Sequence, residues 1–355
     1  AAGTTKSSIL TQENLQVDLR VVEPDCFCAA LQYFTGSKEH NVRLRERAVR
    51  RGLKVNEYGV FRVKTNRRLA GREEEDVYRA LGLAWIPPEI REDRGEIEAA
   101  AADRLPRLIE QANLKGDFHI HTTWSDGSDR LEAMPAAGAA RGYEYLVICD
   151  HSRSLKVAHG MSIARIRQQM AKIRGLNRRA SRCTLLTGSE VDILNDGSLD
   201  YPDDILRELD VVIGSIHTGF QQDERTLTNR IVRAMHNPYV TIIAHPTGRL
   251  MGQRDPYPVD LEAVFEAARE TQTALEINAY PRRLDLSDTA AWRARELGVT
   301  LAISTDSHSL DQLDQMAFGL GVARRAWVEP SQVLNCLSRR QLLAWVGRKR
   351  KRLAS

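Results

Sequence analysis

Cysteine is scarce in this chain: five occur in 355 residues, at Cys26, Cys28, Cys149, Cys183 and Cys336. Their number is odd, their spacing is scattered, and no two form a C-x-x-C pair. This usage argues against a disulfide framework and against a zinc site built from thiolates. It favours a reducing environment, so the expected location is cytoplasmic.

Long apolar runs are also missing. No stretch approaches the roughly 20 residues that a membrane-spanning helix needs, and no secretory signal opens the chain, so we expect no membrane partner. The chain begins without methionine, inside an expected strand, and we expect it to be part of a longer protein. Its apolar fraction of 42% and charged fraction of 28% are ordinary for a globular protein of two or three domains.

Neither sign of charge dominates, because the formal net charge is only +4. Basic residues are nevertheless concentrated in RLRERAVRRGLK (43–54) and in GRKRKR (347–352). Solvated helix faces and a frayed tail would explain either stretch alone. Two such stretches together favour a partner with a phosphate backbone.

The first 72 residues have the pattern of a small α+β domain. LQVDLRVV (15–22) alternates apolar and polar residues, which is typical of a half-buried strand. A helix, a basic helix and a strand pair in KVNEYGVFRV (54–63) are expected to follow. The acidic, Ala-rich segment 73–113 reverses the charge of the preceding block, and we expect it to be a helical linker of two short helices.

Residues 114–345 show a different rhythm, in which short apolar runs alternate with helix-like stretches. Such alternation implies βαβ units and a parallel sheet. About seven units in roughly 240 residues suit a closed or nearly closed barrel better than an open sheet. We expect residues 346–355 to form a basic tail. The runs are GDFHI (116–120), YLVICD (145–150), TLLTGSEVDI (184–193), VVIGSIH (211–217), VTIIAH (240–245), ALEINA (274–279) and TLAIST (300–305).

Histidines and carboxylates fall at the ends of these runs. Functional residues of a parallel barrel belong at the C-terminal ends of its strands, and residues two apart on a strand face the same side. One such histidine is more often an ordinary core or surface residue, but a whole set at one end indicates a metal site. The set is His119, His121, Asp126, His151, Glu190, His217, His245, Asp306 and His308.

The chemistry of these ligands narrows the choice of metal. Imidazole and carboxylate without thiolate suit Zn²⁺, Mn²⁺ or Fe²⁺ better than Mg²⁺ or Ca²⁺. Nine ligands are too many for one ion and suit three, if a carboxylate bridges two of them. Closely spaced metals activate a shared water and neutralise phosphate charge. Phosphoester hydrolysis is therefore the expected reaction class.

The order HxH…D…H…E…H…H…DxH resembles the polymerase and histidinol phosphatase (PHP) domain, over about two-thirds of the chain. The resemblance implies a distorted (β/α)7 barrel with up to three Mn²⁺ or Zn²⁺ ions, and catalysis centred on Glu190, His119, His121 and Asp306. By position, one metal would be held by His119, His121, Glu190 and Asp306. Glu190 would bridge to a second metal, held also by His217 and His245, and the third would be held by Asp126, His151 and His308.

The N-terminal stretch VDLRVV…YFTGSKEHNVRLR resembles the end of the palm and the start of the thumb of a family X DNA polymerase. The alternative for this stretch is a helix-turn-helix with a basic face. With the barrel behind it, the chain closely resembles bacterial polymerase X proteins. The resemblance implies contacts with nucleotide sugar from Tyr33, Phe34 and Gly36, minor-groove contacts from Asn41 and Arg45, and a metal-binding carboxylate at Asp18.

The same resemblance implies that the parent protein is a DNA polymerase that uses Mg²⁺ and acts in DNA repair. The two carboxylates that should precede Asp18 are not in this sequence, and one aspartate cannot hold two ions, so we expect no polymerase activity from this chain. Its expected reaction is 3′–5′ hydrolysis of DNA, with 3′-end processing and cleavage at abasic sites. The expected substrates are primer 3′ ends and gapped or abasic duplexes.

Loops after the strands hold candidates for phosphate or DNA binding, each of which could instead be a surface charge or a loop cap. Trp124 either stacks on a base or caps the open end of the barrel. The other candidates are Lys156, His159, Arg249, Arg254, Asn278 and Arg283.

Two other functions stay open. A small-molecule phosphatase of the histidinol-phosphate kind would need neither a thumb nor a basic tail. A non-catalytic DNA-binding module would need no intact set of nine ligands, because structural metal sites are usually closed and four-coordinate.

Overall fold

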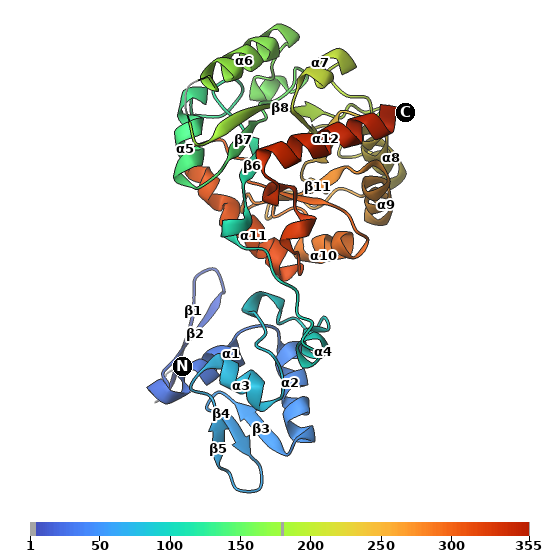
Figure 1. The fold of residues 1–355 in the computed structure, drawn as a ribbon. Helices are drawn as coiled ribbons and strands as arrows, with labels where there is room; N and C mark the ends of the chain where they lie inside the picture. Colours follow the sequence, from blue (N-terminus) through green and yellow to red (C-terminus); the bar gives the residue numbers. More distant parts are fainter. Residues whose placement is uncertain (1–4, 179–180, 355) are drawn as a thin grey trace. The chain divides into compact units, whose positions relative to one another are not determined.

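The computed structural model describes residues 5–178 and 181–354, and the chain forms two compact units, Ala1–Pro106 and Arg107–Ser355 (Figure 1). The first four residues and the last residue of the expected domains lie outside the described part. The segment 73–113 differs from the expected linker, because most of it belongs to the first unit. No described helix is long and apolar enough to cross a membrane.

The two helices of that segment are integral to the first unit because their acidic side chains form ion pairs and hydrogen bonds within it. α3 (Glu74–Ala80) provides Glu74, which forms an ion pair of 2.9 Å with the buried Arg91. α4 (Glu96–Ala101) provides Glu96, whose Oε1 lies 2.5 Å from Nδ1 of His40 in α2 (Lys38–Arg50). Tyr78 completes the group, with its hydroxyl 3.1 Å from His40 Nε2.

The remaining elements of the first unit are α1 (Phe27–Phe34), a hairpin and a three-stranded antiparallel sheet. The expected strand pair is confirmed as β3 (Leu53–Asn56) and β4 (Gly59–Arg62), and β5 (Arg68–Ala70) adds a third strand that lacks an apolar alternation.

The hairpin consists of β1 (Lys6–Leu10) and β2 (Gln16–Arg20). The prediction that 15–22 is half-buried is wrong, because every residue of β2 is exposed, including Leu19 at 65%. Among the described residues, no further strand pairs with this hairpin.

The second unit is a nearly closed barrel of seven parallel strands in sequence order, which confirms the expected fold. The barrel is joined around its seam where His121 N donates to Ser307 O (2.8 Å) and Ser307 N donates to His119 O (3.2 Å). Every predicted run forms a strand. The strands are β6 (Gly116–Ile120), β7 (Tyr145–Ile148), β8 (Thr184–Asp192), β9 (Val211–Ser215), β10 (Val240–Ile243), β11 (Ala274–Asn278) and β12 (Leu301–Ser304).

Helices surround the barrel and bury one apolar face each, as Val264 and Phe265 do in α9. Several begin at a side chain that accepts a backbone N–H, such as Ser162 before α6 and Asp223 before α8, which satisfies an otherwise unpaired donor. The helices are α5 (Met134–Ala140), α6 (Ile163–Leu176), α7 (Asp203–Glu208), α8 (Glu224–Met235), α9 (Leu261–Thr271), α10 (Asp288–Glu296) and α11 (Met316–Arg325).

The last helix, α12 (Arg339–Ala354), crosses one end of the barrel (Figure 1). Leu342 and Val346 are buried with the side chains that fill the barrel interior, such as Phe118 and Val147. Lys349 reaches the residue before β11, since its Nζ donates to Thr273 Oγ1 at 3.0 Å. The expected tail 346–355 is therefore, over its described residues, the second half of a helix that covers the N-terminal ends of the strands.

Candidate metal centre

All nine predicted ligands lie at the other end of the barrel, where the strands finish, and most of them surround one buried carboxylate. Glu190, on β8, is 1% exposed. Its Oε1 lies 3.2 Å from His217 Nε2 and 3.0 Å from His245 Nε2, and its Oε2 lies 3.3 Å from His119 Nε2 and 2.9 Å from His151 Nδ1. The expected bridging position of Glu190 is consistent with this arrangement.

A second carboxylate, Asp126, faces the opposite side of His151. Its Oδ2 lies 3.5 Å from His151 Nε2 and 3.4 Å from His308 Nε2, and its Oδ1 lies 3.7 Å from His121 Nδ1. A turn in the loop after β6 brings Asp126 inward. Its next residue, Gly127, passes so close to His121 that a Cβ there would lie 2.6 Å from the His121 backbone.

Three sets of ligand atoms each lie within 4.8 Å of one another. They agree with the expected three sites in number and differ in detail. His121 lies near Asp126 as well as near Asp306, whose Oδ1 is 3.2 Å from His121 Nε2, and His151 belongs to two sets. The sets are His121, Asp126, His151 and His308; His119, His121 and Asp306; and His151, Glu190 and His217.

The donor set fits divalent metals, because several buried nitrogen and oxygen atoms have no hydrogen-bond partner among the described residues. His119 Nε2, both ring nitrogens of His121, His151 Nδ1 and Glu190 Oε2 are in this state. Buried polar atoms are almost always satisfied in native proteins, so this many in one place need a common partner. Imidazole nitrogens that converge with carboxylate oxygens make such a group suited to Zn²⁺ or Mn²⁺.

The electrostatics of the centre favour the ligand forms of His121 and Glu190, whereas the charge of Glu190 outweighs the effect of burial and raises the pKa of His119, His151 and His217. Burial, together with the nearby His151, lowers the pKa of His121 to about 3, so His121 is neutral at physiological pH. Burial alone would raise the pKa of Glu190, but the charges of His217 and His119 outweigh it and lower that pKa well below its usual value. Metal binding requires neutral imidazole and ionised carboxylate.

Two carboxylates that were not predicted from the sequence lie beside the Nδ1 atoms of predicted histidine ligands. Glu276 Oε1 lies 2.8 Å from His119 Nδ1, and Asp192 Oδ1 lies 2.6 Å from His217 Nδ1. A histidine ligand commonly donates its other ring N–H to a carboxylate, which fixes its tautomer. The sequence feature that could have identified such a residue is a carboxylate inside an apolar strand, as Glu276 is in ALEINA.

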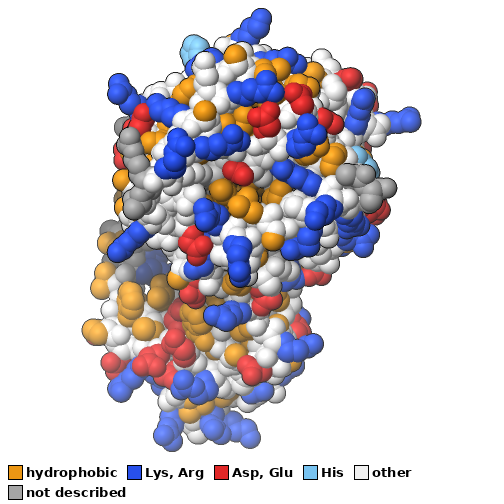
Figure 2. Space-filling view, turned by 45° about the horizontal axis from the view of Figure 1, so that its top comes forward, with side chains coloured by type: hydrophobic (Ala, Val, Ile, Leu, Met, Phe, Trp, Pro, Cys, Tyr) orange, Lys and Arg blue, Asp and Glu red, His pale blue; other side chains and the backbone are white. Residues whose placement is uncertain are grey.

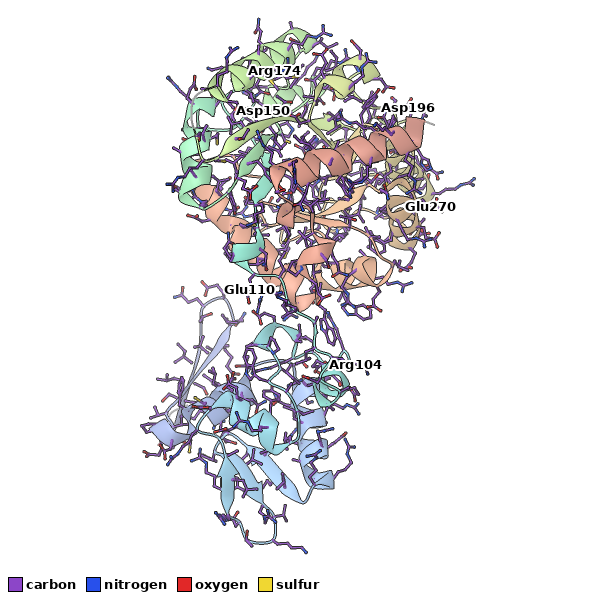
Figure 3. All side chains as sticks on the ribbon, viewed as in Figure 1. Arg104, Glu110, Asp150, Arg174, Asp196 and Glu270 are labelled. Carbon is purple, nitrogen blue, oxygen red and sulfur yellow. The ribbon has the colours of Figure 1, made fainter. Side chains whose placement is uncertain are left out.

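A further missed carboxylate, Asp150, which is labelled in Figure 3, orders the loop after β6. It precedes the predicted ligand His151, and its own oxygens accept hydrogen bonds from the loop after β6. It accepts from Thr122 N (2.8 Å) and Thr122 Oγ1 (2.7 Å), and from Ser125 Oγ (2.6 Å). This loop carries Asp126, so Asp150 positions a ligand without being one.

One basic phosphate candidate, Arg283, contacts a predicted ligand. Its Nε lies 3.3 Å from Asp306 Oδ2, and its Nη1 is buried without a hydrogen-bond partner in the described part of the chain. It lines a cavity of about 260 Å³ beside the centre, together with Leu250, Tyr280, Asp306, His308 and Gln312. A guanidinium, an aromatic ring and two predicted ligands therefore share one cavity.

Two other phosphate candidates, Arg249 and Arg254, donate hydrogen bonds to carbonyl oxygens of nearby loops. Arg249 donates to the carbonyl oxygens of Arg283 and Leu284, and Arg254 Nε donates to Gly248 O at 2.8 Å. Their guanidinium groups therefore act as loop caps in this structure.

Asn278 is a neighbour of the ligands. Its Nδ2 lies 3.1 Å from both Glu276 Oε2 and Asp306 Oδ2. Its amide therefore supports two carboxylates of the centre.

Lys156 and His159 are exposed in the loop after β7. Trp124 is half-buried, packs against the barrel core, and has Arg165 and Lys172 each 5.9 Å from its ring centroid. These contacts favour the capping role for Trp124 over base stacking.

In the first unit, four of the expected polymerase residues lie in or beside a tight turn. Gly36 has φ +95°, and a Cβ there would lie 2.5 Å from the Cβ of Arg91, so glycine is required. Tyr33 and Phe34 contact edge to face, with ring centroids 5.1 Å apart. The neighbouring helix carries Asn41, whose Nδ2 donates to Ser37 O at 3.3 Å.

Arg45 and Asp18 are both exposed. Lys6 Nζ lies 2.7 Å from Asp18 Oδ2, and this bond lowers the pKa of Asp18. Asp18 is therefore an ionised carboxylate held by a cation on the neighbouring strand.

Comparison with known proteins agrees with both units. Residues 30–92 match the DNA polymerase beta thumb model, and residues 117–279 match the PHP domain model. The chain is 44% identical over 350 residues to the DNA polymerase/3′-5′ exonuclease PolX of Bacillus subtilis (strain 168), which covers 98% of this chain and 61% of that protein. The chain thus spans about 61% of the length of this relative.

Other relatives match the barrel. A probable phosphatase of Thermoanaerobacter sp. (strain X514) is 31% identical over 231 residues, which covers 62% of this chain and 89% of the relative. A histidinol phosphate phosphatase from Lactococcus lactis, solved with zinc, L-histidinol and phosphate, superposes with a TM-score of 0.46 at 15% identity, over 61% of this chain and 94% of that one. The chain therefore belongs to the PolX family, and joins a DNA polymerase beta thumb to a PHP domain.

Proposed function

We propose that the barrel hydrolyses DNA phosphodiesters from the 3′ end, with Mn²⁺ or Zn²⁺ held by the nine strand-end residues. The observation that carries the proposal is the convergence of four histidines on Glu190, beside a cavity that presents the guanidinium of Arg283. The name of the PolX relative, which includes a 3′-5′ exonuclease, supports DNA as the substrate.

Each side chain has a role in this proposal. Glu190 would bridge two metal sites, Asp306 would complete one of them, and Asp126 would hold the third with His151 and His308. When bound, the metals would supply an activated water and charge neutralisation at the phosphate. Arg283 would bind a phosphate oxygen in the cavity, since its buried Nη1 has no partner within the described protein.

The test is digestion of a 5′-labelled primer annealed to its template, with and without Mn²⁺, beside the double variant His119→Ala, His121→Ala. A descending ladder that needs Mn²⁺ and is absent from the variant supports the proposal. An intact primer with DNA still retarded on a gel would favour the binding module instead.

Cleavage at abasic sites and removal of 3′-blocking groups, as in DNA repair, are finer parts of the proposal. A primer that ends in a 3′-phosphate and a duplex with one abasic site would test them, and neither product should form in the double variant.

A small-molecule phosphatase is the second candidate, favoured by the similarity of the barrel to a probable phosphatase. Turnover of histidinol phosphate against turnover of the 3′-labelled oligonucleotide separates the two. Faster hydrolysis of the monoester would put the phosphatase first.

The parent protein is proposed to be a DNA polymerase that uses Mg²⁺, and this chain is proposed to lack that activity. Primer extension with dNTPs and Mg²⁺ checks the second statement directly, and extension by this chain would refute it.

A further inference from the structure

The basic residues at the end of α12 form two groups, one that faces the barrel and one that is exposed. Lys349 is 1% exposed and donates to Thr273 Oγ1 at 3.0 Å, and Arg350 Nη2 donates to Leu209 O at 2.7 Å. These two side chains face the barrel. Arg348 and Lys351, their immediate neighbours, are exposed.

The exposed cations share one face of the helix with Arg340. Residues 340, 344, 348 and 351 follow the spacing that places side chains on one side of an α-helix. We call Arg340, Arg348 and Lys351 the α12 basic face. At 1.5 Å per residue it is about 16 Å long, and Ala344 between its ends leaves it unobstructed. Among the described residues, no carboxylate pairs with any of the three, and α12 itself contains no Asp or Glu.

This face has no evident role in folding. Leu342 and Val346, on the other side of the helix, provide the packing against the barrel interior. Like charges three or four positions apart destabilise a helix, as Arg348 and Lys351 are. A favourable interaction with the helix dipole is limited to the last turn, so it does not account for Arg340. A polyanion outside the chain would offset this repulsion.

We propose that the α12 basic face is a second DNA-binding surface, which contacts the phosphates of a duplex at the end of the barrel opposite the metal centre. Duplex DNA carries one phosphate per about 1.7 Å of its axis, so a face of this length passes several. Figure 2 shows Lys and Arg side chains spread over this side of the barrel. An anionic membrane is a poorer match, because Leu342 and Val346 of α12 are buried in the barrel interior, and the exposed Leu343 (37%) is a single large apolar side chain, too little to insert.

The test measures binding of the whole chain to a labelled duplex with phosphorothioate 3′ ends, by fluorescence anisotropy in EDTA over a range of salt concentrations. The variant is Arg340→Gln, Arg348→Gln, Lys351→Gln. The matched control removes three exposed cations that do form ion pairs, through Arg167→Gln, Lys172→Gln, Arg293→Gln.

We expect the α12 variant to bind roughly tenfold or more weakly at low salt, and its plot of log affinity against log salt to lose a slope of about two to three, near one per phosphate contact. The control variant should keep the wild-type slope. Arg340→Lys, Arg348→Lys should also keep it. Equal slopes for the wild type and the α12 variant, with both folded by circular dichroism, would overturn the proposal.

Binding to vesicles of equal parts phosphatidylcholine and phosphatidylglycerol provides the other arm. Loss of vesicle binding with unchanged DNA binding would assign the face to a membrane and overturn the proposal. The assay contains no metal and needs no cleavage, so it is independent of the nuclease proposal. Hydrolysis of bis(p-nitrophenyl) phosphate, which is too small to reach α12, should be equal in the wild type and the α12 variant.

Discussion

Nδ1 of His119 lies 2.8 Å from Oε1 of Glu276, and both side chains are fully buried. Oε2 of the same carboxylate accepts the backbone N–H of His245 at 2.6 Å. One carboxylate therefore orients a side chain and a backbone segment of two predicted ligands on different strands. It also leaves Nε2 of His119 facing Glu190.

Glu276→Ala should weaken metal binding by about 10- to 100-fold, the usual cost of losing a carboxylate behind a histidine ligand. Competition of Mn²⁺ or Zn²⁺ against a fluorescent chelator measures the affinity without reference to activity. Glu266→Ala, at an exposed position of α9, is the control. Wild-type affinity in Glu276→Ala would show that His119 does not depend on this carboxylate.

Gly127→Ala should disturb the loop that carries Asp126, because a Cβ at this position meets the His121 backbone at 2.6 Å. We expect fewer metal ions per chain, counted by mass spectrometry under native conditions. The control is Gly175→Ala in α6, where the nearest atom to a new Cβ is 3.7 Å away. It should leave the metal content unchanged and stabilise the helix by up to about 1 kcal/mol. Full metal content in Gly127→Ala would contradict the close contact.

Arg283→Gln should raise KM for DNA more than it lowers kcat, because the guanidinium faces the cavity rather than the Glu190 carboxylate. Loss of a hydrogen bond to a charged group costs about 1.5–3 kcal/mol, which corresponds to roughly 10- to 100-fold. Inorganic phosphate should also inhibit the variant less. Arg254→Gln, whose side chain bonds a loop carbonyl, serves for comparison, and similar kinetics in the two variants would remove Arg283 from phosphate binding.

Lys349→Met should increase stability most at and below neutral pH. Burial lowers the pKa of Lys349 from 10.5 to about 7, so folding disfavours its charged form. The unfolded chain then binds more protons between pH 7 and 10.5, and the free energy of unfolding rises with pH in this window. The penalty is present in full below pH 7, and each pKa unit corresponds to about 1.4 kcal/mol.

Urea unfolding of the wild type and Lys349→Met at pH 6 and at pH 9 checks this pH dependence. The gain in the variant should be larger at pH 6, and Lys351→Met, at an exposed position, should show no such difference. An equal gain at both pH values would mean that Lys349 titrates normally in the folded protein.

Sequence analysis located the seven strands and the nine residues at their ends because both signals are local. An apolar run followed by a histidine or an acidic residue predicts where a strand ends and which side chain follows it. Parallel strands place all such groups at one end, so His119 and Asp306 could be brought together without coordinates. Their joint presence in one centre follows from topology alone.

The same reasoning missed Glu276 and Asp192, and it misjudged the hairpin around Leu19. The residues next to a carboxylate in a strand do not indicate which histidine it contacts across the barrel. Alternation along β2 shows which residues share a face but not whether anything covers that face.

The order of ligand types and the alternation of strands and helices were determined by the sequence itself, because spacing along the chain dictates which side chains share an end of the barrel. Only the tertiary structure decided which members of GRKRKR face outward. Lys349 and Arg350 turn inward because Thr273 and the carbonyl of Leu209 lie within hydrogen-bond distance across the barrel end. Arg348 and Lys351 are exposed because the helix turns by about 100° per residue, and no neighbour covers that face among the described residues.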